Sequence, residues 1–317
     1  MLLRTLFIGN PCRLHLADGQ FIATYNHVKG QELMREKKAP IEDLGCVVLE
    51  HPQINITHGL LNALIKHNVA LIACDDKMMP SGMLLNLDGH TLQSERFRAQ
   101  IEAAEPLKKQ LWQQTIVAKI RNQGQVLNRW DQAGGFLLER TRHVKSGDVG
   151  NEEGRCSYYY WQHLFPPAWN FYRKREGLPP NNLLNYGYAI IRGITARALT
   201  GSGLLPTFGI FHRNRYNSYC LADDVMEPYR PFVDHAVREI IYSNSHVEEV
   251  SREHKVHLLQ VLQTDVKIDG QLSPLSVAVQ KTAASLALCF TGEKRKILYP
   301  ELPAWNRKGS MPTASCG

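Results

Sequence analysis

The chain has 317 residues, 44% hydrophobic and 21% charged, which is the composition of an ordinary globular protein with room for two domains. With 37 Lys and Arg against 30 Asp and Glu, the formal net charge is +7. This surplus favours a polyanionic partner, although many proteins are mildly basic without one. Seven widely spaced cysteines without a CxxC pair exclude a disulfide framework and a zinc ribbon, and predict a reducing, cytoplasmic location. We expect no secretory signal, and no membrane segment, because the most apolar late stretch, 276–290, is interrupted by Gln280 and Lys281.

The first part of the chain is predicted to be rich in β-strands. Apolar side chains alternate with other residues in 12–16 and again in 21–25, and Asp18-Gly19 between them is a two-residue turn signal. This pattern predicts a β-hairpin. Residues 46–49 and 69–74 are expected to form buried strands.

A short helix is expected between these two buried strands, with Thr57 as its N-cap and its end near His67. A further turn is predicted at Pro80-Ser81-Gly82.

Beyond residue 92 the apolar period changes from two to about 3.6, which indicates helices. Trp112, Ile116 and Ile120 fall on one face of the first. Further helices are expected at 186–199, at 224–242, at 247–262 and after Ser273-Pro274, where the serine would be the N-cap.

The predicted fold class is therefore α+β, with a β-rich, β-sandwich-like domain followed by an all-helical domain. The expected boundaries are 1–85 for the first domain, 86–91 for a linker, 92–302 for the helical domain and 303–317 for a flexible tail.

Candidate metal ligands lie in three separate segments, at Glu153, His212 and Glu227. Asp224 precedes Glu227 by three residues, so both would share one helical face, whereas Asp223 would meet solvent. One imidazole with carboxylates suits a divalent ion that handles phosphates. Each residue also has a simpler explanation: a structural histidine, an acidic helix start, or an ion pair between Glu227 and Arg230.

The surroundings of these residues resemble a known family, the CRISPR-associated integrases and endonucleases of CRISPR adaptation. The resemblance covers nearly the whole chain, up to about residue 300, and the stretch GIFHRNRYNSYCLADDVMEPYRP is similar to the type II branch. The blocks that carry it are Glu153–Trp161, Leu178–Arg192 (LPPNNLLNYGYAIIR), Gly203–Pro231 and the run Lys119–Gln123.

The resemblance implies that Glu153, His212 and Glu227 bind Mg²⁺ or Mn²⁺, with Glu227 where other members have Asp. Asp224 matches an acidic position that some branches use in the site, so its role as a ligand or as a helix cap stays open. The reaction implied is the joining of 3′-hydroxyl ends of short DNA duplexes into a repeat array by transesterification. Cys156-Ser157 departs from the usual Ala-Ala, and the residues after Trp305 have no counterpart.

The family also implies partners. The β-rich domain would form a homodimer, and two dimers would be bridged by a small ferredoxin-like CRISPR adaptation subunit. In type II systems the RNA-guided effector nuclease also takes part. Double-stranded DNA would need basic residues, each of which could equally be solvated surface; the candidates are Arg213, Arg215, Arg173, Lys174, Arg175, Lys294, Arg295 and Lys296.

Two alternatives remain open at this point. A metal-dependent nuclease for branched or single-stranded DNA would use the same residues and differ only in its products. A non-catalytic DNA-binding scaffold would need the basic residues alone, and the occurrence of Glu153, His212 and Glu227 together argues against it.

Overall fold

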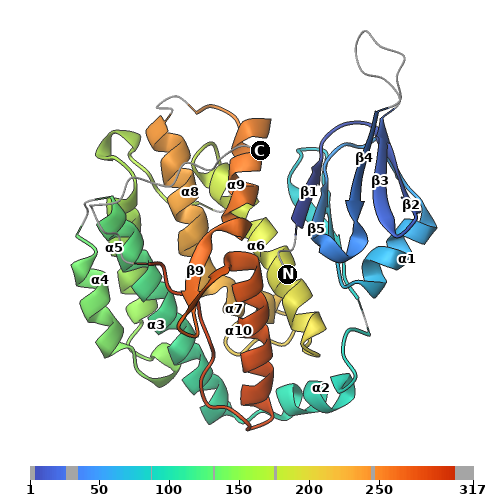
Figure 1. Ribbon diagram of the computed structural model, residues 1–317. Helices are drawn as coiled ribbons and strands as arrows, with labels where there is room; N and C mark the ends of the chain where they lie inside the picture. The colour runs from blue at the N-terminus through green and yellow to red at the C-terminus, as the bar shows by residue number, and fades with distance from the viewer. Residues whose placement is uncertain are drawn as a thin grey trace.

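The computed structural model describes residues 4–25, 35–86, 88–130, 133–174, 177–243 and 247–303. A β-rich amino-terminal part is followed by a helical part (Figure 1), which confirms the predicted α+β class. The elements of the first part are β1 Arg4–Ile8, β2 Cys12–Ala17, β3 Gln20–Tyr25, β4 Arg35–Pro40, β5 Leu44–Leu49, β6 Ile54–Ile56, α1 His58–Lys66, β7 Ala70–Cys74 and β8 Pro80–Leu84.

These strands form two four-stranded sheets, in the orders β1-β5-β7-β8 and β4-β3-β2-β6. In the first sheet, β5 pairs in parallel with both β1 and β7, so it is an interior strand without a free edge. Successive side chains of a strand point to opposite faces. Val47 accordingly belongs to the core inside the β-rich part, whereas Cys46 and Val48 belong to the core of the helical part.

The predicted hairpin and the predicted helix cap are both confirmed. β2 and β3 are antiparallel and joined by Asp18-Gly19, both at positive φ. The Thr57 side chain accepts a hydrogen bond from Leu60 N at the start of α1.

The turn predicted at residues 80–82 is wrong, because Pro80 begins β8. The chain reverses earlier, where the Asp75 carboxylate accepts hydrogen bonds from Lys77 N and Met79 N. An Asx turn supplies the reversal that the sequence analysis assigned to proline and glycine.

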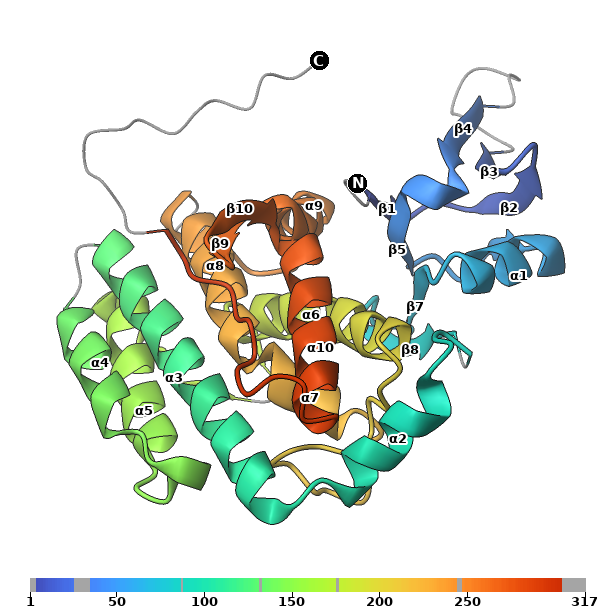
Figure 2. The ribbon, with the colours of Figure 1, turned by 60° about the horizontal axis from the view of Figure 1, so that its bottom comes forward.

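The helical part is built around two long helices, α3 and α6 (Figures 1 and 2). Trp112, Ile116 and Ile120 of α3 are all buried, as their spacing predicted. The helices are α2 Gln93–Glu102, α3 Glu105–Arg129, α4 Gly135–Arg140, α5 Glu152–Leu164, α6 Asn181–Gly201, α7 Cys220–Met226, α8 Arg230–Ser243, α9 Arg252–Gln260 and α10 Leu275–Phe290.

The segment expected as one helix over 224–242 is two helices. α7 begins at Cys220, and a 3₁₀ turn over Glu227–Tyr229 connects it to α8. The helix expected from residue 247 begins only at Arg252, where the Ser251 side chain accepts a hydrogen bond from His254 N.

A two-stranded hairpin interrupts the helical part, which was expected to contain helices alone. It consists of β9 Asp265–Ile268 and β10 Gln271–Pro274, joined by Asp269-Gly270 at positive φ. Ser273 is paired in this ladder, so it does not cap α10, whose N-cap is Pro274.

The core of the helical part extends into the β-rich part and so joins the two. Ala70 and Ile72 of β7 pack into the core of the helical part. A Cβ atom at Gly193 of α6 would lie 2.5 Å from Ile72 Cδ1, so the absence of a side chain there makes room for Ile72 between the helix and the sheet. The residues expected as a linker, 86–91, lie between β8 and α2.

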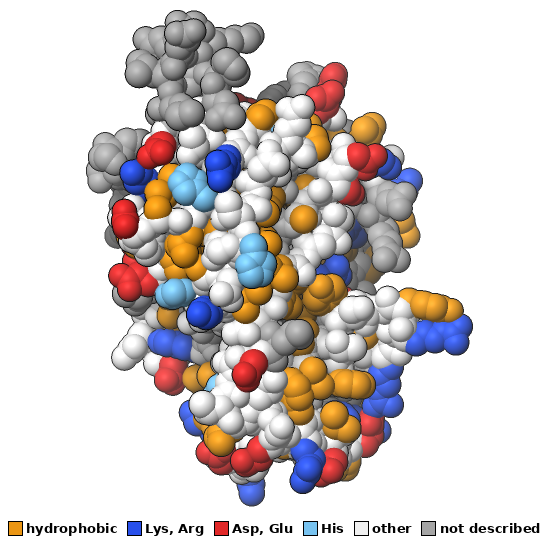
Figure 3. Space-filling model, turned by 90° about the vertical axis from the view of Figure 1, so that its right-hand side faces the viewer, with side chains coloured by type: hydrophobic (Ala, Val, Ile, Leu, Met, Phe, Trp, Pro, Cys, Tyr) orange, Lys and Arg blue, Asp and Glu red, His pale blue; other side chains and the backbone are white. Residues whose placement is uncertain are grey.

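The expected tail, 303–317, lies outside the described residues apart from Pro303. None of the helices described above is both long and apolar enough to cross a bilayer. The face formed by the β-rich part carries acidic and basic side chains interspersed with hydrophobic ones (Figure 3), so the net positive charge is not gathered there.

Candidate active site

Two adjacent glutamates at the start of α5 point to different partners. The backbone N–H groups of Glu152 and Glu153 donate to the Asp148 carboxylate, at 2.9 and 3.0 Å, which fixes the first turn. Glu152 is buried against Arg140, with hydrogen bonds of 2.7 and 2.6 Å. Glu153 instead faces Lys119 of α3.

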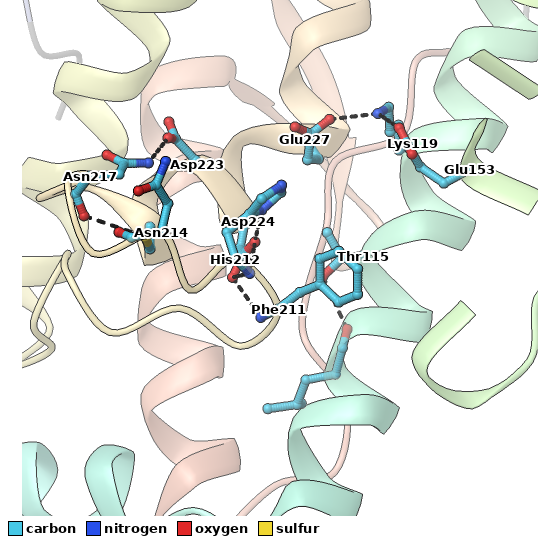
Figure 4. A network of polar contacts seen from close by, with 12 residues as sticks. Thr115, Lys119, Glu153, Phe211, His212, Asn214, Asn217, Asp223, Asp224 and Glu227 are labelled. Atoms are coloured by element: carbon cyan, nitrogen blue, oxygen red, sulfur yellow. Dashed lines mark hydrogen bonds and ion pairs between the residues drawn. The ribbon is translucent and has the colours of Figure 1, made fainter. Parts of the chain in front are cut away.

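Lys119 lies between two carboxylates (Figure 4). Its Nζ is 2.5 Å from Glu153 Oε1 and 2.7 Å from Glu227 Oε2. The Lys119 side chain is only 9% exposed. Burial alone would lower the pKa of Lys119, but the charges of Glu227 and Glu153 raise it above its ordinary value.

Glu227 is held at the junction of α7 and α8. Asn122 of α3 donates a hydrogen bond to Pro228 O, at 2.9 Å, and so fixes the 3₁₀ turn that begins at Glu227. The Glu227 side chain is 6% exposed, and its Oε1 pairs with Arg230 at 3.2 Å. Burial would raise the pKa of Glu227, but Arg230 and Lys119 outweigh it and hold the pKa below its ordinary value. Glu227 is therefore ionised despite its burial.

His212 comes from the loop between α6 and α7. Its Nδ1 lies 2.5 Å from Asp224 Oδ1, and Phe211 N donates to Asp224 Oδ2 at 2.9 Å. The hydrogen bond with Asp224 raises the pKa of His212. A Cβ atom at Gly209 would lie 2.5 Å from His212 O and 2.7 Å from Asp224 Oδ2, so this loop closes over Asp224 only with glycine at that position.

Phe211 anchors the same loop on α3. Its ring stacks on Trp112, with centroids 4.2 Å apart and planes within 1° of parallel, and the His212 ring meets Trp112 edge-on at 5.7 Å. Because Trp112 and Lys119 lie on the same helix, α3 positions both the histidine and the two glutamates.

Asp224 is fully buried in α7 and holds the histidine loop, whereas the helix N-cap is Tyr219. Helix capping is thus excluded as its role. The expectation that Asp223 meets solvent is wrong: Asp223 is buried and accepts hydrogen bonds from Arg192 Nε at 2.6 Å and Asn217 Nδ2 at 2.7 Å.

The structure thus groups the four acidic and histidine candidates into two pairs, Glu153 with Glu227 and His212 with Asp224 (Figure 4). Within the described ranges, no three His, Cys, Asp or Glu side chains converge closely enough to form a complete metal site.

The side chains present nevertheless have the donor atoms that a divalent cation takes, carboxylate oxygens and an imidazole nitrogen. One cationic atom, Lys119 Nζ, already contacts both glutamates. Glu227 Oε2 is buried and forms an ion pair with Nζ but no hydrogen bond. Asp224 accepts a hydrogen bond from His212 Nδ1, and the other ring nitrogen, Nε2, stays available to a ligand. This is the usual arrangement of a metal-binding imidazole.

Two of the predicted DNA-binding residues follow His212 in the same loop. Arg213 is exposed and pairs with Glu105 at 2.6 Å, and exposed Arg215 lies 4.6 Å from the Tyr216 ring centroid. A cavity of about 480 Å³ opens beside His212, and Lys108, Arg213 and Arg215 contribute to its lining. These basic side chains can contact a phosphate backbone.

None of the other basic candidates that the structure describes lines this cavity. Arg173 donates to Asn181 Oδ1 at 2.9 Å and to Asn185 Oδ1 at 2.8 Å, which holds the start of α6. Lys174 and residues 294–296 are exposed. Arg175 lies outside the described residues.

Lys119 is the site residue that the sequence analysis missed. It lies three residues after Ile116 and seven after Trp112, on the face of α3 that is otherwise buried. A lysine at a core position of an amphipathic helix needs a buried anion as partner, and this was the available signal.

Cys156 and Tyr160 behave as core residues. Both are fully buried in α5, and burial raises the pKa of the Cys156 thiol to about 12. A thiol held neutral in this way is not a nucleophile.

Comparison with known proteins gives the family of the chain. The family model of the CRISPR associated protein Cas1 matches residues 6–260. A CRISPR-associated endonuclease Cas1 from Neisseria meningitidis serogroup C (strain 8013) is 33% identical over 302 residues, covering 94% of this chain and 96% of the relative. The chain belongs to the Cas1 family. The resemblance seen in the motifs is confirmed.

Solved structures share the fold of this Cas1-family chain. A casposase bound to integration product has a TM-score of 0.78 at 22% identity, with 98% of this chain and 96% of that chain covered. A Cas6-RT-Cas1–Cas2 complex contains a chain with a TM-score of 0.69 at 19% identity, with 96% of this chain and 36% of that chain covered. At these identities the likeness extends to the fold.

Proposed function

We propose that this Cas1-family protein is a divalent-metal-dependent DNA integrase of CRISPR adaptation. It would join the 3′-hydroxyl ends of short duplex fragments to the repeat array by transesterification. One observation supports the proposal most strongly. Glu153 and Glu227, from separate segments, both contact Lys119 Nζ, and the His212–Asp224 pair lies beside them.

Glu153, Glu227 and His212 Nε2 would hold Mg²⁺ or Mn²⁺. When bound, the ion polarises the scissile phosphate and stabilises charge on the departing oxygen. The histidine in the set favours Mn²⁺ more than oxygen ligands alone would. Asp224 acts as the positioning residue for His212 rather than as a ligand, because its oxygens already accept from Phe211 N, His212 N and His212 Nδ1.

The cavity beside His212 would receive the DNA. Lys108, Arg213 and Arg215 place positive charge at its edge, where a phosphate backbone can be held without reading its sequence. The ring of Phe211 stacks on Trp112 and so holds the histidine loop against α3.

The proposal extends to the assembly. Residues 1–85 would form the homodimer and residues 92–302 the catalytic domain, with a small ferredoxin-like adaptation subunit bridging two dimers. The type II effector nuclease would take part in selecting fragments. The fold shared with a chain of a Cas6-RT-Cas1–Cas2 complex supports the bridging subunit, and the fold shared with a casposase bound to integration product supports the reaction.

Strand transfer tests this function. The purified protein is incubated with the bridging subunit, a short duplex and a supercoiled repeat plasmid, first with Mn²⁺ and then with EDTA. We expect joined products that require the metal and disappear in Glu153→Ala. Cutting without joining would instead identify the nuclease suggested by the relatives named endonuclease, and metal-independent binding without either reaction would identify a scaffold.

A further inference from the structure

The two proposed metal-binding glutamates are already bridged by a cation that belongs to the chain. Lys119 Nζ contacts one oxygen of each glutamate, at 2.5 Å for Glu153 Oε1 and 2.7 Å for Glu227 Oε2. A shared ion that contacted these same two oxygens would lie at the position of Nζ. The ammonium therefore occupies the space between the carboxylates where a divalent cation would bind.

Each glutamate has a second support that does not depend on Lys119. Ser157 Oγ donates to Glu153 Oε1 at 3.2 Å, and Arg230 pairs with Glu227 Oε1 at 3.2 Å. The two carboxylates can therefore stay in place when the ammonium leaves.

The charges around the pair balance without any added ion. Lys119 and Arg230 carry two positive charges, against the two negative charges of Glu153 and Glu227. A divalent cation in contact with the same oxygens would lie within a few ångströms of Lys119 Nζ, where two cations repel each other strongly in a poorly solvated site. Both cannot keep these contacts at once.

We propose that Lys119 is an internal counter-ion, which holds Glu153 and Glu227 together until a divalent cation binds and then yields those oxygens. Its ammonium, a compact charge on a flexible stem, can turn from the carboxylates toward the phosphate that the site receives. Lys119 is thus a positioning residue, and its presence weakens the binding of the metal to the free protein. This inference rests on the proposed metal site.

If Lys119 competes with the metal, removing it should tighten metal binding. Removing a lysine with a purely structural role would not. In Lys119→Met the binding of Mn²⁺, measured from the electron paramagnetic resonance signal of the unbound ion, should tighten about tenfold, or about 1.4 kcal/mol. The EDTA-treated variant should melt at a lower temperature than the EDTA-treated wild type, and Mn²⁺ should stabilise the variant more. Strand transfer by the metal-loaded variant should fall, because the phosphate loses a cation.

Two further variants make the comparison specific. In a Glu153→Gln background, where one of the two carboxylate charges is gone, Lys119→Met should change Mn²⁺ affinity much less. Lys255→Met removes another buried lysine, one that pairs with Glu50 away from the site, and should leave Mn²⁺ affinity unchanged.

The outcomes separate this inference from the proposed function. If the wild type transfers strands with Mn²⁺ but Lys119→Met binds the ion equally or more weakly, the competition is refuted and the function stands. If the wild type neither binds Mn²⁺ nor transfers strands, the proposed function is refuted and the inference with it.

Discussion

His212 Nδ1 lies 2.5 Å from Asp224 Oδ1, and Asp224 is completely buried beneath the loop that carries the histidine. Nδ1 therefore acts as the donor, and Nε2, which has no hydrogen-bond partner among the described residues, keeps the lone pair that a ligand needs. The orientation of the imidazole is set by α7 rather than by its own loop.

Replacing Asp224 with Asn should weaken the metal site without removing a ligand. An amide has only one acceptor oxygen, so Asn cannot accept both from Phe211 N and from His212 Nδ1, and the imidazole loses its orientation. We expect Mn²⁺ affinity to fall by about 10–100-fold, the usual effect of such a substitution. Titration of the Mn²⁺ signal measures it.

The neighbouring aspartate provides the control. Asp223 bonds to Arg192 and Asn217 and does not touch His212, so Asp223→Asn should leave Mn²⁺ affinity unchanged. If Asp224→Asn abolished binding as completely as Glu227→Gln, Asp224 would be a ligand instead.

Of the two adjacent glutamates of α5, Glu153 should matter for activity and Glu152 for stability. Glu153→Gln should abolish strand transfer and leave the fold intact, because the Glu153 side chain is 34% exposed and contributes to the site. Glu152→Gln breaks the buried pair with Arg140, so it should lower the free energy of unfolding by about 2 kcal/mol while the folded protein still transfers strands. Urea unfolding and the strand-transfer assay measure the two effects. Equal activity in both variants would contradict these roles.

A buried ion pair joins the β-rich part to the helical part. Lys255 of α9 contacts Glu50, and the two side chains are 6% and 10% exposed. Lys255→Met leaves Glu50 without its partner and should cost about 3–5 kcal/mol in urea unfolding.

Two comparisons test whether the lost ion pair is the cause. The double variant Glu50→Gln/Lys255→Met should recover much of this loss. Lys38→Met, which breaks an exposed pair with Glu36 at 3.1 Å, should cost less than about 1 kcal/mol. A similar loss in both lysine variants would show that burial does not matter here.

Asp234 should make stability depend on pH. Burial raises the pKa of Asp234 to about 7, although the hydroxyl groups of Tyr188 and Tyr160 donate to its carboxylate. In the unfolded chain the same group loses its proton near pH 4. Between these values the folded state holds one proton more, so the contribution of Asp234 to stability falls as pH rises from about 4 to 7 and is level above.

The comparison of wild type with Asp234→Asn isolates this effect. The free energy of unfolding of the wild type, relative to the variant, should decline from pH 5 to 7 by at most about 1.4 kcal/mol per pH unit. Asp265→Asn, at an exposed position, serves as the control. A difference between wild type and Asp234→Asn that does not vary with pH would refute the raised pKa.

Much of the fold could be predicted because local signals and tertiary contacts agree. The turn residues Asp18-Gly19 and the stripe of Trp112, Ile116 and Ile120 specify their elements without reference to the rest of the chain. The hairpin at Asp269-Gly270 carries the same turn signal and was missed, because its four-residue strands lie between helical segments.

Candidate site residues could be named from the sequence, but their arrangement could not. Nothing local shows which of the adjacent Asp223 and Asp224 lies under the histidine loop. That depends on Arg192 of α6 and on the backbone of the loop, both distant in sequence. Lys119 was overlooked for the same reason, since its two partners come from α5 and from the turn after α7.

The proposed function depends most on the binding of one ion by His212, Glu153 and Glu227. Pulsed electron paramagnetic resonance of the Mn²⁺-loaded protein tests this directly, because a coordinated imidazole nitrogen modulates the electron spin echo. We expect a nitrogen coupling in the wild type that disappears in His212→Gln while Mn²⁺ remains bound to Glu153 and Glu227. Bound Mn²⁺ without a nitrogen coupling in the wild type would contradict the account.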